Sequence, residues 1–233
     1  MMTLSDAHGF RKAVAGICML LAPLAFLAAA IVTPTIDSTH EGAILRGVAS
    51  NPDRFYIATL LIIISIVFLV PAVLGLMHML RERRVAWGHA GGALALVGTL
   101  AFALGSGVQL MEWQMVRGGA RRGEMITLLH RFDHSAGTQV FFWFSVAFLA
   151  GMALLAIGLY LAEAVHWSTA LVLTLGAGML EAALIANRSW MFIVAAGLLL
   201  VGFGSVGTMV LREPAEDWEH TPRFGGFRPA TTH

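Results

Sequence analysis

Residues 55–80 read FYIATLLIIISIVFLVPAVLGLMHML and contain no Asp, Glu, Lys or Arg. A helix rises ~1.5 Å per residue, so about 20 apolar residues cross the ~30 Å hydrocarbon core of a bilayer. This stretch exceeds that length, and charged residues bound it, Arg54 before it and Arg81 after it. It therefore predicts a transmembrane helix.

Five more apolar stretches flank this one. The whole chain of 233 residues is 58% hydrophobic and 12% charged, whereas an ordinary soluble domain is about 45–50% apolar. Because the apolar residues form long separate runs, they indicate several spans and not one soluble core. We predict an all-α fold, a polytopic integral membrane protein with a bundle of six transmembrane helices. The expected spans are about 13–33, 55–80, 85–110, 139–163, 169–185 and 190–211.

The two ends of the chain are more polar than its middle. Residues 1–12 are expected to form an N-terminal tail, and residues 212–233, which contain three prolines, a disordered tail. The first apolar stretch follows Arg11 and Lys12 and so resembles a secretory signal peptide. It is longer than the ~7–15 apolar residues of such a peptide, and we expect a retained helix.

Six spans place both termini on one side of the membrane, and Lys and Arg decide which side. Eight of these residues fall on the side of the termini and seven on the other, so the bias is small. The tight RERR turn at 81–84 favours cytoplasmic termini, and the basic loop at 118–124 opposes them. We expect a cell membrane location with cytoplasmic termini. The many Arg, Ala and Gly residues favour a bacterial inner membrane.

Several classes of function find no support in the sequence. The net charge of +1 gives no electrostatic basis for nucleic acid binding, and the single Cys18 has no partner for an internal disulfide. Catalytic serine signatures, phosphate loops, HExxH and dinucleotide motifs are absent. Six spans also leave little loop for a soluble catalytic site. We therefore favour a non-enzymatic protein and leave an enzyme open.

One acidic residue, Glu181, falls inside an expected span. It precedes Asn187 by six residues, which places it ~9 Å below the interface. A charged carboxylate near mid-membrane costs about 3 kcal/mol, so Glu181 should be neutral, paired or in contact with water. One interpretation is a proton or cation site. The other is a protonated carboxyl that only bonds a neighbouring helix.

A second group of polar residues is expected at the membrane surface away from the termini. It combines the end of the third span, the approach to the fourth span and the first long loop. Glu181, Glu112, Gln109 and Asp133 are the candidates for proton or ligand binding. The whole group contains Asp37, His40, Glu41, Gln109, Glu112, His130, Asp133, His134 and Gln139.

The stretch LLHRFDHSAGTQV at 128–140 contains the two histidines of this group. Residues 123–135 carry an apolar stripe beside charged positions, which predicts an amphipathic helix along the interface. His130 and His134 would share one helix face and could bind a metal, with Glu112 or Glu181 as an oxygen ligand. Without the Glu of HExxH the pattern is weak. We favour ordinary interfacial histidines, with Asp133 or Ser135 capping the fourth span.

Haem is not expected. His78 and His89 lie at matching depth on the second and third spans, but the short turn between these spans makes them neighbours at ~8–10 Å, too close for a porphyrin. No cofactor is therefore predicted, and a metal ion at His130 and His134 stays the alternative.

Three functions stay open. The first is a transport-like or proton-coupled protein that uses Glu181, with helices broken at Pro23 and Pro71; we rank it highest. The second is an accessory or assembly subunit, which would meet a partner membrane protein or a second copy through the Gly-rich sixth span. The third is a membrane metalloprotein with His130 and His134 as ligands. In all three cases the protein is embedded in the lipid bilayer.

Overall fold

The protein is a helical bundle in the computed structural model, which describes residues 7–117, 121–213 and 218. This part of the chain contains eight helices and no strand. Six helices are long and apolar enough to cross a membrane, which confirms the predicted fold. They are α1 (Ala7–Val32), α3 (Pro52–Met79), α4 (Val85–Arg117), α6 (Ala136–Leu161), α7 (Trp167–Ala186) and α8 (Ser189–Arg212); the shorter helices are α2 (Glu41–Ser50) and α5 (Arg122–Asp133).

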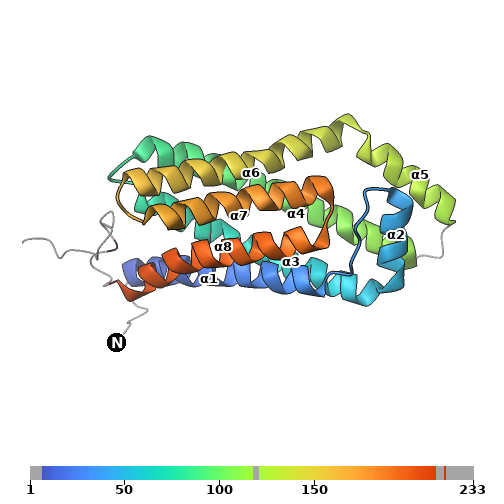
Figure 1. Cartoon of the computed structure of the whole chain (residues 1–233), viewed down its shortest axis with the longest axis horizontal. Coiled ribbons are helices and arrows are strands. Elements are labelled where there is room, and N and C mark those ends of the chain that lie inside the picture. Colours follow the sequence, from blue (N-terminus) through green and yellow to red (C-terminus); the bar gives the residue numbers. More distant parts are fainter. Residues whose placement is uncertain (1–6, 118–120, 214–217, 219–233) are drawn as a thin grey trace, which may run out of the picture.

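The six long helices pack in a ring that follows the chain order. Each packs on the next long helix, and α8 returns to pack on α1. The start of α1 and the end of α8 lie at one end of the bundle, here called the terminal end (Figure 1). Helices α2 and α5 lie together at the opposite, distal end.

Some helix boundaries differ from the expected ones. Helix α1 begins at Ala7, so part of the expected N-terminal tail is helical. Helix α4 continues to Arg117 and, with its 33 residues, is about 50 Å long at ~1.5 Å per residue. It therefore extends beyond the hydrocarbon core. The sequence did not predict α2, whose 10 residues lie in the expected first loop.

The expectation of broken helices at the two prolines is wrong. Pro23 lies inside α1 and Pro71 inside α3, and both helices continue through them. Proline is tolerated within membrane helices because neighbouring helices and local adjustments satisfy the backbone groups that it frees.

The start of α1 and the segment after α8 are tied together at the terminal end. The Lys12 ammonium donates a hydrogen bond to the carbonyl oxygen of Glu213. Trp218 is buried, and its ring stacks on His78 with 4.8 Å between centroids. The expected disorder of 212–233 otherwise concerns residues 214–217 and 219–233, which lie outside the described part.

Helices α4 and α6 approach each other through glycine. A Cβ atom on Gly151 of α6 would lie 2.2 Å from the backbone nitrogen of Ala95 and 2.6 Å from the carbonyl oxygen of Gly91, both on α4. Neither backbone atom can move away unless α4 moves with it. Small residues permit this approach, which van der Waals packing stabilises in lipid, where helices gain no hydrophobic drive to associate.

The glycines of α8 are also used in packing within the chain. A Cβ on Gly202 would lie 2.7 Å from the Leu173 side chain of α7, and one on Gly207 would lie 2.9 Å from the carbonyl oxygen of Gly16 on α1. These two positions are therefore covered and are not free to meet a partner. A Cβ on Gly197 would meet nothing within 4 Å.

Replacing Gly151 with Ala should destabilise the bundle. The added methyl group meets backbone, and overpacking of this kind typically costs ~1–3 kcal/mol. Thermal unfolding of the detergent-solubilised protein, followed by circular dichroism, should give a lower midpoint for Gly151→Ala.

The matched control is Gly105→Ala on α4, where a Cβ meets nothing within 4 Å. Alanine is the better helix former by up to ~1 kcal/mol, so this midpoint should stay or rise. Equal midpoints for the two variants would contradict a glycine-dependent contact between α4 and α6.

Candidate functional site

Helices α2 and α5 pack on each other at the distal end. Gly42 of α2 lies beside Ile126 of α5, whose Cδ1 atom would be 3.5 Å from a Cβ at that position. Leu129 is buried at 1% exposure and anchors the middle of α5. Glu41 stands in the first turn of α2 and His130 in the last turn of α5. The negative charge of Glu41 suits the positive end of the α2 dipole.

The junction between α5 and α6 is fixed by two polar side chains. The Ser135 hydroxyl accepts a hydrogen bond from the Thr138 amide at 3.3 Å, so Ser135 caps α6. The Thr138 hydroxyl donates to the carbonyl oxygen of Phe132 at 2.6 Å. Of the two predicted caps, Ser135 is confirmed, whereas the Asp133 side chain makes no hydrogen bond within the described residues. The junction sets the direction of α5 relative to α6.

The segment that leads into α2 is tied to the α7–α8 connection. Asn187, in the left-handed conformation at φ 45°, donates a side-chain hydrogen bond to the carbonyl oxygen of Ser38. The Asp37 carboxylate accepts from the Ser189 amide at 2.8 Å and so caps the start of α8. The His40 amide donates to the Ser38 hydroxyl at 3.2 Å. Asp37 therefore has a structural role.

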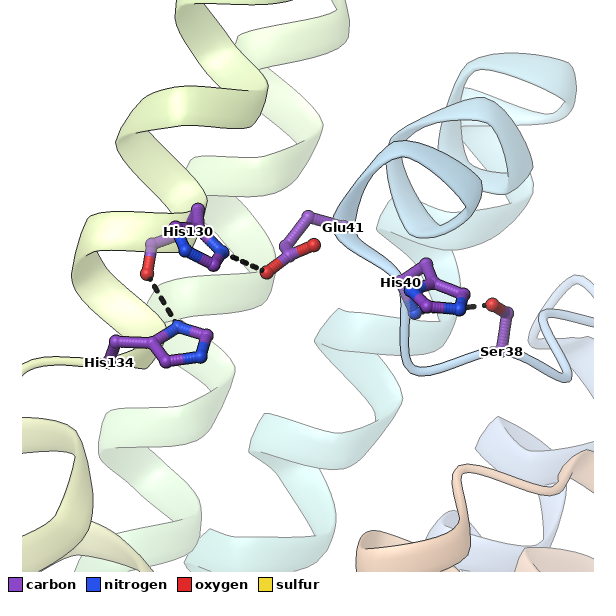
Figure 2. Close-up of polar contacts among 5 residues, drawn as sticks. All are labelled: Ser38, His40, Glu41, His130 and His134. Atoms are coloured by element: carbon purple, nitrogen blue, oxygen red, sulfur yellow. Dashed lines mark hydrogen bonds and ion pairs between the residues drawn. The ribbon is translucent and has the colours of Figure 1, made fainter.

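Three side chains of the predicted distal group converge between α2 and α5. Figure 2 shows His130 directed at Glu41, with His134 one turn further along. His130 Nδ1 lies 2.7 Å from Glu41 Oε1, and the two imidazole rings are 4.1 Å apart between centroids. One ligand atom from each of the three residues lies within 4.8 Å of the others.

Hydrogen bonds fix the tautomers of both histidines. His134 Nδ1 lies 2.9 Å from the carbonyl oxygen of His130, which can only accept, so this nitrogen carries the hydrogen. The ionised Glu41 carboxylate likewise accepts from His130 Nδ1. The neutral His134 ring then presents the lone pair of Nε2. An ion shared by Glu41 and His130 would instead take the place of the hydrogen on His130 Nδ1.

The electrostatics around these histidines favour a cation. Hydrogen bonds from His130 and from its own amide lower the pKa of Glu41, so this carboxylate is ionised at neutral pH. Burial, and then the negative charge of Glu41, raise the pKa of Asp133. Glu112 lies within electrostatic reach of Asp133. The carboxyl groups of Glu41, Asp133 and Glu112 thus interact electrostatically, each with the next, at the distal end.

Other predicted residues lie near this site without joining it. Gln109 of α4 has a buried Oε1 atom with no hydrogen-bond partner among the described residues. One turn further, Trp113 stacks on Tyr56 of α3, with centroids 4.5 Å apart, and Arg117 lies over its ring at 4.7 Å. Arg117 also pairs with Asp53. The sequence did not predict this stack, because its members come from two different spans.

Glu181 forms a separate site. It is 4% exposed on α7, and its Oε2 atom lies 3.2 Å from the Ser145 hydroxyl of α6. Within the described part of the chain, no hydrogen bond or ion pair joins Glu181 to Glu112 or His134. Among the described residues, the carboxylate grouped with both histidines as a possible metal ligand is that of Glu41, and not that of Glu112 or Glu181.

Comparison of the chain with known protein families, with curated proteins and with solved structures gives no match.

Loss of the Ser135 cap should loosen the start of α6. An N-cap Ser→Ala substitution typically costs about 1 kcal/mol, so Ser135→Ala should speed hydrogen exchange of the amides in the first turn of α6. Mass spectrometry of peptides that cover residues 136–142 measures this. Ser135→Asp keeps a capping oxygen and should exchange slowly, like the wild type. If both variants exchange alike, the cap does not hold this junction.

Proposed function

We propose that this integral membrane protein binds a divalent transition-metal ion at its distal end, with Glu41, His130 and His134 as ligands, in a non-enzymatic role. The observation that carries the proposal is the approach of three ligand atoms, from α2 and α5, to within 4.8 Å of one another. Histidines four residues apart share one helix face and can chelate one ion.

The donor set favours one class of metal. Imidazole nitrogens suit Zn²⁺, Cu²⁺, Ni²⁺ and Fe²⁺, whereas Mg²⁺ and Ca²⁺ prefer oxygen ligands. With bonds of ~2.0–2.2 Å, tetrahedral ligands of Zn²⁺ lie ~3.4 Å apart. The His130 side chain is 57% exposed and therefore has room to adjust toward this spacing. This exposure also leaves the ion a path from water.

Two features prepare the three side chains for a cation. The Glu41 carboxylate is ionised and lies against His130 Nδ1, where an ion can replace the shared hydrogen. The backbone carbonyl of His130 orients the His134 ring through Nδ1 and leaves Nε2 for the ion. Such supporting hydrogen bonds are worth ~10–100-fold in metal affinity where they have been removed from metal sites.

Titration of the detergent-purified protein with Zn²⁺, followed by calorimetry, tests the proposal. We expect one ion per chain for the wild type and loss of this binding in the His130→Ala, His134→Ala double variant. Glu41→Gln removes the charge but keeps the shape, and should weaken binding ~10–100-fold. Mg²⁺ should give no binding at the same concentrations.

His89→Ala is the matched control. His89 is also an exposed helical histidine, and its Nδ1 atom contacts the carbonyl oxygen of Val85 at 2.9 Å, as His134 Nδ1 contacts that of His130. It lies at the terminal end, and its loss should leave stoichiometry and affinity unchanged. Zn²⁺ binding that survives in the double variant, or that is absent from the wild type, would overturn the proposal.

A further inference from the structure

Glu181 is a buried acid without a basic partner. It is 4% exposed, and its Oε1 atom is buried with no hydrogen-bond partner among the described residues. Helix α7 packs on α6 and α8. The other titratable or charged residues on these three helices are Tyr160 and Arg212, and both stand at the terminal end. No Lys, Arg or His is therefore available to pair with Glu181 from the helices around it.

Because the helices around Glu181 offer no cation, binding an exchangeable proton is the simplest way to neutralise its carboxylate. A buried charge without a partner is strongly unfavourable, and more so inside a bilayer. A carboxylic acid, in contrast, is neutral and needs only an acceptor for its O–H group. Ser145, 9% exposed, presents its hydroxyl oxygen 3.2 Å from Glu181 Oε2.

The Ser145 hydroxyl has two acceptors and one hydrogen. Its oxygen lies 2.8 Å from the carbonyl oxygen of Phe142 and 3.2 Å from Glu181 Oε2. When Glu181 is protonated, its O–H can donate to Ser145, which donates to Phe142. When Glu181 is ionised, the hydroxyl must turn its single hydrogen toward the carboxylate. The two hydrogen-bond arrangements correspond to the two protonation states.

The turn of α6 just before this pair is exposed on the outer surface of the bundle. Phe142 lies three residues before Ser145, and hence on the same helix face one turn nearer the distal end. It is 39% exposed, and the adjacent Trp143 and Phe144 are 66% and 43% exposed. Consecutive helix positions point in directions ~100° apart, so neighbouring helices leave this turn uncovered over a wide arc, and the uncovered side chains are aromatic.

We infer that Glu181 and Ser145 form a proton-binding site inside the bilayer, in which the Ser145 hydroxyl turns from Phe142 to Glu181 when the carboxyl releases its proton. No covalent bond between heavy atoms changes: one proton leaves Glu181 Oε2, and one hydroxyl rotates. The site lies on α6 and α7 and does not depend on metal binding at Glu41, His130 and His134.

Infrared difference spectroscopy of the protein in lipid bilayers, recorded against pH and in D₂O, tests this inference. The wild type should show the C=O stretching band of a buried carboxylic acid, which moves to lower frequency in D₂O and loses intensity as the pH rises. Glu181→Gln should lack this band. Glu124→Gln, the matched control, removes an exposed carboxyl of α5 and should leave the band unchanged.

The Ser145→Ala variant tests whether Ser145 takes part in the proton site or whether Glu181 is a buried acid that acts alone. This variant keeps Glu181 and takes away its hydrogen-bond acceptor, so the C=O band should shift to higher frequency. An unchanged band in Ser145→Ala, or its persistence in Glu181→Gln, would overturn the assignment. A band that responds neither to D₂O nor to pH would overturn proton exchange.

Discussion

The close contact of α4 with α6 determines how the rest of the molecule is arranged. Gly91 and Gly151 let the two backbones meet where any larger residue would hold them apart. Helix α2 packs on α4, and α5 leads through Ser135 directly into α6. The register of α4 against α6 therefore decides where Glu41 meets His130, although no glycine of this contact lies near them.

The surroundings of the two candidate sites have opposite effects on the charge of a carboxylate. Glu41 is next to an imidazole and to water, and it stays ionised because hydrogen bonds stabilise its charge. Glu181 has no basic group on any helix packed against it and only one hydroxyl in contact. An ionised carboxylate is stable in the first setting and strongly unfavourable in the second. The proposed cation site at the distal end and the proposed proton site within the spans both rest on this contrast.

Local features were predictable from the sequence, and distant pairings were not. The six spans follow from uninterrupted apolar runs, and the Ser135 cap from its place before such a run. Helix α2 was missed because its 10 residues are too short for a span and too few to show a clear helical period. The end of α4 was missed because hydropathy falls before the helix ends. Glu41 and His130 stand 89 positions apart, and only the packing of the spans brings them together.

X-ray absorption spectroscopy of the Zn²⁺-loaded protein tests the central claim most directly, because it reports the atoms bound to the ion. Two histidines and one glutamate predict a coordination sphere of nitrogen and oxygen, with the outer-shell scattering of two imidazole rings, and the loss of that scattering in the His130→Ala, His134→Ala variant. A sphere of oxygen atoms alone, or imidazole scattering that survives in the variant, would contradict the assignment of the distal site.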